Sequence, residues 1–462
     1  VKGGLLMHSS KFNRILEFSQ HSVAVITSML FLYTAVFGSF EAVIQRSLLL
    51  LAGLIWAFLY FAKNAESYIS KVLYLIGGLI AIFPSIYLII SWDEIVMRYG
   101  IPLTREYFIG GILVLALLYV GKRLLGWGFT IIVVVFIAYA LLGQHIPGIF
   151  QHSGISIERL LSTTFLTTQG IFGTVMNVAA TVIIQFVIFA SFLRIWGAGD
   201  FFMNITSSIF GAIRGGPAKL AAIGSGLTGM FSGVATANVA TTGSITIPLM
   251  KKNGYPPEFA GGVEASASTG GQILPPIMGA SAFVMAETLG IPISEVMKAA
   301  FIPAILFFFA IYLAVDFKAA KLNLVGLKKE ELPDFKKTLK EGWLYVVPIF
   351  VLVIMIFQQF SPGRSVIFAI LTLILVGFFI KGTKITGAKF IEALKSGAED
   401  TVIITIACSM AGIVIGILNV TGLGVSLGNL LVSLSSGIFI LLLVFTALAS
   451  IVLGMGLPTI AG

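Results

Sequence analysis

Apolar segments long enough to cross a lipid bilayer recur along the chain and limit what it can fold into. They lie at about 22–38, 47–62, 72–91, 108–121, 127–143, 175–196, 296–315, 343–358, 365–380 and 401–418, with shorter apolar runs at about 424–434 and 437–453. A transmembrane helix needs roughly 17 to 25 mainly apolar residues. Of the 462 residues, 58% are hydrophobic and only 11% are charged. The sequence therefore predicts an all-α polytopic membrane protein surrounded by lipid.

The positions of Lys and Arg predict how these segments are oriented. Cytoplasmic loops of membrane proteins carry an excess of positive charge. Most of the 29 Lys and Arg fall on the cytoplasmic side if the N-terminus is cytoplasmic and the region at about 217–290 re-enters once from that side. The residues left outside are Arg46, Arg98, Arg105, Arg159, Lys298 and Arg364. We interpret the net charge of +9 as an orientation signal and not as a nucleic-acid site. The predicted location is a bacterial or archaeal inner membrane.

The stretch Ile223–Pro248, built mainly from Gly, Ser, Thr and Ala, does not resemble an ordinary span. Gly224, Gly226, Gly229 and Gly233 each cost about 1 kcal/mol in a helix interior relative to Ala. Two interpretations remain open. The stretch is a helix packed through small residues, or it is broken at membrane depth so that its free backbone groups line a binding cavity.

A second predicted break lies at Ser266–Pro276, SASTGGQILPP. The paired prolines remove two backbone donors, and we expect Gly270 and Gly271 to let the backbone leave helical geometry. Freed carbonyl groups suit a small hard cation such as Na⁺, whereas the alternative is a kink healed by neighbouring helices and water. Neutral side-chain oxygens near the two breaks come from Ser232, Thr236, Asn238, Thr269 and Gln272.

Two of the polar residues have open alternatives. Asn238 is either a ligand or a satisfied packing residue. Glu264, an acid in a small and apolar helix, either binds a proton or cation or lies at a helix end. Half-helix N-termini at the breaks could also face an anionic substrate group.

Three charged segments are too polar to span a membrane. Ser156–Thr168 and Thr386–Glu399 are predicted to be amphipathic helices lying in the interface. Asp316–Glu341, with Pro333 in its middle, is predicted to be a cytoplasmic linker between two halves of the chain.

The second half of the chain repeats features of the first. Gly197, Gly199, Asn204 and Gly229–Met230 align with Gly422, Gly424, Asn429 and Gly454–Met455. The spans at 175–196 and 401–418 run in opposite directions in the predicted topology, so the repeats are inverted, as is typical of secondary transporters. The second repeat stops soon after its break, so we expect the natural protein or its functional unit to continue beyond Gly462.

Several other functions find no support in the sequence. It has no Gly-x-x-x-x-Gly-Lys-Ser/Thr loop for nucleotide binding. No serine, cysteine or metal-ligand constellation indicates an enzyme. A passive anion channel or uniporter of the same architecture, and a structural or assembly protein of the membrane, remain as rival functions. A flux assay with and without a Na⁺ gradient distinguishes the channel from a coupled transporter.

The segment from Gly229 to Glu287, GMFSGVATANVATTGSITIPLMKKNGYPPEFAGGVEASASTGGQILPPIMGASAFVMAE, resembles the large membrane subunit of tripartite ATP-independent periplasmic (TRAP) transporters. LGMGLPT at 453–459 is similar to the second hairpin of that family. The N-terminal spans look like a fused small subunit, as in permeases paired with TAXI-type binding proteins. The early stop departs from the family pattern and leaves the second hairpin incomplete.

The resemblance implies a Na⁺-coupled importer of the elevator type with two re-entrant hairpins. A periplasmic binding protein would deliver a small organic acid such as a dicarboxylate. The implied regions are a four-span small-subunit-like region at 1–125, a first half at 126–316 with a hairpin at about 217–250 and a broken helix at about 257–290, a linker at 317–341, and a second half at 342–462.

The resemblance also implies the site residues. The first Na⁺ site would use Ser232, Gly233, Asn238, Thr269, Gly270, Gln272 and Pro275. A partial second Na⁺ site would use Gly454, Gly456 and Thr459. The substrate would contact Ser232, Thr236, Gly271 and Pro276. No nucleotide cofactor is expected.

Overall fold

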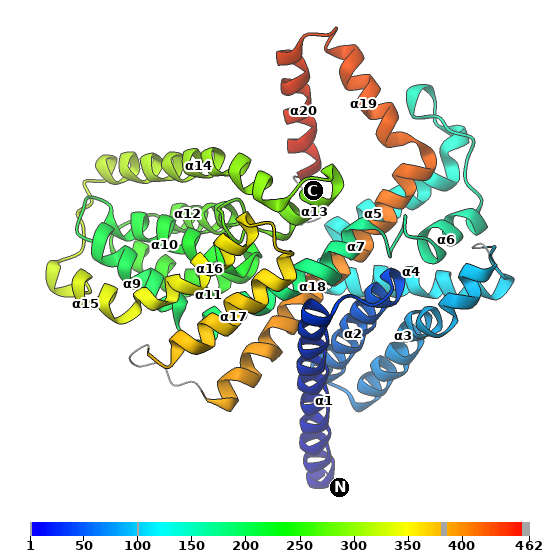
Figure 1. Ribbon diagram of the computed structural model, residues 1–462, viewed down its shortest axis with the longest axis horizontal. Helices are drawn as coiled ribbons and strands as arrows, with labels where there is room; N and C mark the ends of the chain where they lie inside the picture. Colours follow the sequence, from blue (N-terminus) through cyan, green and yellow to red (C-terminus); the bar gives the residue numbers. More distant parts are fainter. Residues whose placement is uncertain (1, 99–100, 380–385, 455–462) are drawn as a thin grey trace. The chain divides into compact units, whose positions relative to one another are not determined.

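The computed structural model describes residues 2–98, 101–379 and 386–454, and the described part is helical (Figure 1). The helices before the first break are α1 (Lys2–Phe37), α2 (Ala42–Lys63), α3 (Tyr68–Met97), α4 (Thr104–Leu124), α5 (Trp127–Leu142), α6 (Ile157–Leu166), α7 (Thr174–Val178), α8 (Ile184–Ile195), α9 (Ala198–Phe210) and α10 (Gly216–Ser232). The later helices are α11 (Ala235–Lys252), α12 (Pro257–Gly271), α13 (Ala280–Leu289), α14 (Ile293–Lys321), α15 (Phe335–Gly342), α16 (Val346–Phe357), α17 (Pro362–Gly377), α18 (Gly387–Thr421), α19 (Leu423–Leu434) and α20 (Phe439–Gly454).

Short turns of other helix types join some of these elements. A π-helical turn, Ala179–Ile183, connects α7 to α8. The 3₁₀ turns are Gly143–His145, Gly148–Phe150, Lys329–Glu331 and Trp343–Tyr345.

Nine helical segments in the described ranges are long enough to span a membrane. Each is at least 18 residues long and strongly apolar, so the predicted all-α polytopic membrane protein is confirmed. Helices α10, α11 and α12 are not among the nine. Helices α10 and α12 are shorter than 18 residues, and α11 has 18 residues, many of them Gly, Ser and Thr. The prediction that the region from about 217 to 290 does not consist of ordinary spans is therefore confirmed.

Contacts divide the chain into two compact units, and each is described by itself. Unit 1 comprises residues 1–30, 38–181 and 399–462, and unit 2 comprises residues 31–37 and 182–398.

In unit 1, α2 packs along α3, and α4 packs against α3, α5 and α6. The buried Arg46 on α2 donates through its guanidinium to the Phe172 carbonyl and to Asn177 Oδ1 (3.3 Å). A second buried charge, Glu106 on α4, accepts from Arg98 (2.6 Å) and from the Tyr87 hydroxyl (2.7 Å). These two buried charged groups are thus paired, as their desolvation requires.

In unit 2, α10, α11 and α12 pack against one another, and α14 packs on α10 and α12 (Figure 1). Small side chains make this close packing possible. The core of the cluster consists of Ala218, Ala221, Ala222, Met250, Tyr255, Ala260, Val263, Val315 and Ala319. At the edge of this unit, Asp316 on α14 forms ion pairs with Arg214 and with Lys219 (2.6 Å).

Two of the predicted polar segments differ from expectation. The predicted interfacial helix Thr386–Glu399 is not a separate element, because α18 runs without a break from Gly387 to Thr421. The Glu399-Asp400 step contains no Pro or Gly that would end the helix. The predicted linker Asp316–Glu341 is partly helical, since α14 extends to Lys321 and α15 begins at Phe335.

The other predicted amphipathic segment forms α6. Ser156 caps this helix by accepting a hydrogen bond from the Arg159 amide (3.2 Å). This is the usual role of a serine at the N-cap.

Candidate functional site

The first break separates α10 from α11 and falls at Gly233 and Val234. Gly233 adopts a left-handed conformation with φ of 64°, which glycine reaches without the penalty that a Cβ imposes. Val234 is extended, and α11 begins at Ala235. Helices α10 and α11 occupy the region at about 217–250 for which a hairpin is predicted. The predicted Gly229–Met230 break is wrong in position, because both residues lie inside α10.

The second break separates α12 from α13 and spans residues 272–279. It lies within the region at about 257–290 for which a broken helix is predicted. Met278 in this segment has φ of 63°, an uncommon conformation for a residue with a side chain. The Pro275–Pro276 bond is cis. The chain thus leaves helical geometry where the paired prolines predicted it would.

Gly270 and Gly271 serve a different purpose from the predicted one. Both lie in the last turn of α12 and not in the irregular segment. A Cβ on Gly271 would stand 2.7 Å from the backbone carbonyl carbon of Gly229, and one on Gly270 would stand 2.4 Å from a ring carbon of Phe307. These glycines therefore let α12 approach α10 and α14 closely.

Gln272 connects the two breaks. Its side-chain amide nitrogen donates to the Gly233 carbonyl at 3.0 Å, and its backbone carbonyl accepts from the Gly279 amide at 2.7 Å. The side-chain oxygen, Oε1, is buried and has no hydrogen-bond partner in the part of the chain that the structure describes. Buried polar atoms almost always have a partner. The two breaks therefore meet around an unsatisfied oxygen acceptor.

Asn238 is buried near the start of α11 and belongs to a polar cluster between the helices. Its side-chain nitrogen lies 2.9 Å from the Ser225 carbonyl, Ser225 Oγ and Ser268 Oγ and shares its two hydrogens among these acceptors. The nitrogen of Asn238 is therefore satisfied within the packing between the helices, as the packing interpretation expects.

The remaining residues predicted for the first site occupy different environments. Thr236 and Thr269 are exposed, and the Thr269 hydroxyl donates to the Ala265 carbonyl at 2.8 Å. Pro275 and Pro276 are half-buried. The backbone of Ser232 ends α10, but its side chain lies outside the described residues.

Glu264 lies in the middle of α12, so the predicted alternative of a helix-end position is wrong. Its carboxylate is fully buried among hydroxyl groups. We call Glu264, Ser225, Thr242, Thr246 and Ser268 the Glu264 cluster. Sequence reasoning identified the acid but missed its partners. Asn238, Thr242 and Thr246 recur every fourth residue and so share one face of α11, which is the pattern that could have found them.

The predicted second Na⁺ site cannot be placed. Gly454 is the last residue of α20 and is exposed, and nothing lies within 4 Å of where its Cβ would be. Gly456 and Thr459 lie outside the described residues.

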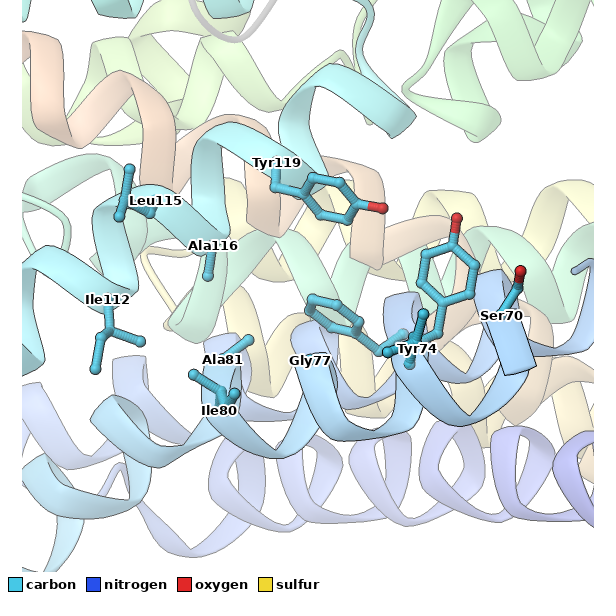
Figure 2. A pocket seen from close by; sticks show the side chains of 11 residues that line it. Ser70, Tyr74, Gly77, Ile80, Ala81, Ile112, Leu115, Ala116 and Tyr119 are labelled. Carbon is cyan, nitrogen blue, oxygen red and sulfur yellow. The ribbon is translucent and has the colours of Figure 1, made fainter. Parts of the chain in front are cut away.

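A groove of about 530 Å³ lies in unit 1 along α3 and α4 (Figure 2). Its walls are mainly apolar, and the hydroxyl groups of Tyr74 and Tyr119 are at one end. Arg123 donates to the Tyr74 hydroxyl at 2.7 Å. None of the predicted site residues lines this groove.

Comparison with known proteins gives one family. The family described as "Tripartite ATP-independent periplasmic transporter, DctM component" matches residues 112–462. The matched region begins inside α4 and includes both breaks. No curated protein sequence matches the chain.

Proposed function

The chain belongs to the DctM component family of tripartite ATP-independent periplasmic (TRAP) transporters, and on this basis we propose that it is a Na⁺-coupled importer of a small organic acid. Family membership and the apolar helices make it a multi-pass protein of the inner membrane that carries out transport. In TRAP systems the DctM component works with a periplasmic binding protein. The proposal includes coupling to Na⁺, a small organic acid as the substrate and an elevator movement.

The observation that carries the Na⁺ site is the buried Oε1 of Gln272, which has no hydrogen-bond partner among the described residues and belongs to the side chain that bonds to the Gly233 carbonyl. Hard cations prefer neutral and anionic oxygen ligands, including backbone carbonyls and side-chain amides. A cation at this position would satisfy the buried acceptor and hold the two breaks together. The proposed ligands Ser232, Gly233, Asn238, Thr269, Gly270 and Pro275 come from the same two breaks or from the turns that flank them.

The organic acid is proposed to bind near the same breaks. Helices α11 and α13 begin at Ala235 and Ala280, directly after the two irregular segments. The first backbone N–H groups of a helix and its dipole favour a negative charge. A carboxylate facing these helix starts would lie next to Thr236, Gly271 and Pro276, the residues predicted to contact substrate.

Further parts of the proposal concern the rest of the transporter. We propose that α10 and α11 form the first re-entrant hairpin and move with the substrate as an elevator. Residues 1–125 would act as a fused small subunit of the TAXI-associated type. The second Na⁺ site would use Gly454, Gly456 and Thr459.

Uptake by reconstituted protein tests this function. Proteoliposomes containing the full-length transporter receive its periplasmic binding protein and a panel of labelled mono- and dicarboxylates, with an inward gradient of either Na⁺ or K⁺. We expect uptake of one class of acid only with the Na⁺ gradient and the binding protein. Equal uptake with either cation would instead indicate a uniporter or passive anion channel.

Variants at the breaks locate the coupling ion in the same assay. Gln272→Met removes the unpaired oxygen while nearly keeping the side-chain volume, and it should raise the Na⁺ concentration needed for half-maximal uptake. Ser232→Ala and Asn238→Ala should do the same. Thr241→Ala is the control, since Thr241 is exposed on α11 and its hydroxyl bonds only to the Ala237 carbonyl (2.9 Å). An unchanged Na⁺ dependence in all three site variants would rule out this position.

A further inference from the structure

The Glu264 carboxylate is surrounded by hydrogen-bond donors from three helices. Oε1 accepts from the hydroxyls of Ser225 on α10 (2.6 Å) and Thr242 on α11 (2.5 Å), and Oε2 accepts from Thr246 on α11 (2.6 Å). Ser268, one turn further along α12, adds a longer contact of 3.3 Å to Oε1. An ionisable group buried in a transport protein is costly and indicates a function.

Fixed positive charge does not neutralise this carboxylate. Among the described residues, none of the ion pairs includes Glu264. The ionisable residues on the helices packed against it, and near the ends of α12, do not hydrogen-bond to it either. They are Lys219 on α10, Lys251 and Lys252 on α11, Glu258 on α12, Glu295, Lys298, Tyr312, Asp316, Lys318 and Lys321 on α14, and Tyr255 before α12. Hydroxyl groups alone therefore support the acid.

The threonine hydroxyls have a second acceptor available. Thr242 Oγ1 lies 2.8 Å from the Asn238 carbonyl, and Thr246 Oγ1 lies 3.1 Å from the Thr242 carbonyl. A hydroxyl carries one hydrogen but can accept as well as donate. When Glu264 is charged, the threonines donate to it. When Glu264 is protonated, it can donate to Thr246, whose hydrogen then turns to the backbone carbonyl.

Both protonation states of Glu264 are thus satisfied without moving a heavy atom. The oxygen spacings also argue against a metal ion in this cluster. Oxygens 2.5–2.6 Å apart are joined by hydrogen bonds, whereas a hard cation stands about 2.3–2.6 Å from each ligand and separates them. The site is also tightly packed, since a Cβ on Gly243 would stand only 3.1 Å from Glu264 Cγ.

We propose that Glu264 is a proton-binding site, and that it exchanges its proton when α10 and α11 shift against α12 during transport. This second part rests on the proposed transport function. Asn238 connects the cluster to the first break, because it donates to Ser225 and Ser268 and lies at the start of α11. A change in hydrogen bonding at Glu264 would therefore reach the region of the proposed ion and substrate sites.

Infrared difference spectra of the purified full chain, recorded between acidic and alkaline pH, test proton binding without any substrate. We expect the carbonyl band of a protonated carboxylic acid in the wild type and its loss in Glu264→Gln. Glu258→Gln is the matched control, because Glu258 is exposed in the first turn of the same helix. A difference spectrum of Glu264→Gln that equals the wild-type spectrum would overturn the proposal.

A second variant keeps the test decisive if Glu264→Gln does not fold. Thr246→Val retains the acid and the side-chain shape but removes one hydrogen-bond partner. The carbonyl band should then move to a different frequency, since its hydrogen bonding has changed. A band that stays in place would mean that the titrating acid lies elsewhere, which contradicts the proposal.

Uptake in proteoliposomes tests the coupling to transport. The ratio of uptake at pH 6 to uptake at pH 8 should fall to about one in Glu264→Gln and stay at the wild-type value in Glu258→Gln. An unchanged ratio in Glu264→Gln would refute the coupling. Wild-type uptake that does not depend on Na⁺ would contradict the proposed Na⁺-coupled transport. It would leave proton binding by Glu264 intact, because the infrared band does not depend on Na⁺.

Discussion

Gly271 and Gly262 lie in the same helix, α12, but differ in what an added methyl group would meet. At Gly271 it would stand 2.8 Å from the Gly226 carbonyl oxygen and equally close to the Gly229 Cα. Backbone atoms of a packed helix cannot turn aside as a side chain can. At Gly262 nothing lies within 4 Å. The close contact between α10 and α12 thus depends on Gly271 and not on Gly262.

Gly271→Ala should therefore destabilise the protein by about 1–3 kcal/mol, the usual cost of overpacking a core. Gly262→Ala should be neutral or slightly stabilising, because alanine favours a helix over glycine by about 0.5–1 kcal/mol. Thermal unfolding of the two variants in the same detergent provides the comparison. Equal melting temperatures would show that the close helix contact is absent.

The sequence predicted some site residues but not their bonds. Gln272 can be predicted because it supplies a neutral oxygen near the second break, yet its contact with Gly233 joins residues from different breaks and has no sequence pattern. Glu264 was noted as an acid in an apolar helix. Its environment depends on how α10 and α11 pack against α12, and such packing is a property of tertiary structure that local spacing does not determine.

At the scale of whole elements, buried polar side chains connect helices that are distant in sequence. Arg46 on α2 is nearly buried and bonds to Phe172, just before α7, and to Asn177, within α7. The ion pair between Lys63 and Glu17 (3.0 Å) also joins two helices but is partly exposed to solvent. Water competes with the exposed pair, so the two connections should differ in strength.

Arg46→Met should lower stability by about 1.5–3 kcal/mol, since it removes charged hydrogen bonds and leaves a buried carbonyl unpaired. Lys63→Met should change it by less than about 1 kcal/mol. Neither substitution should disrupt the helix that carries it. The melting temperatures of the two purified variants, measured by fluorescence, therefore report the difference in strength between the two connections. A larger effect at Lys63 than at Arg46 would contradict this assignment.

Most helices could be predicted because each apolar run is long and bounded by charged or turn-forming residues. The predicted break between residues 399 and 401 is an exception. The mixed charges and helical spacing of Thr386–Glu399 predict an interfacial helix ahead of the span at about 401–418, but α18 continues from one segment into the other. Charge alone does not end a helix unless the backbone also lacks hydrogen bonds or meets a proline.

For the whole molecule, the family and the fold class followed from the sequence, whereas the arrangement of the candidate site depends on the fold. The long segment from Gly229 to Glu287 resembles the TRAP large subunit, and the matched family covers residues 112–462. The inverted repeat, the fused small subunit and the second hairpin remain predictions. Residues that would test the second hairpin, Gly456 and Thr459, lie outside the described part of the chain.

The central claim is that the two breaks form a Na⁺ site around Gln272. An ion that binds only the folded protein raises its stability as its concentration rises. We predict that Na⁺ raises the melting temperature of the purified protein more than K⁺ at equal ionic strength, and that Gln272→Met removes this difference while Thr241→Ala keeps it. The same Na⁺-specific shift in Gln272→Met as in the wild type would contradict the claim.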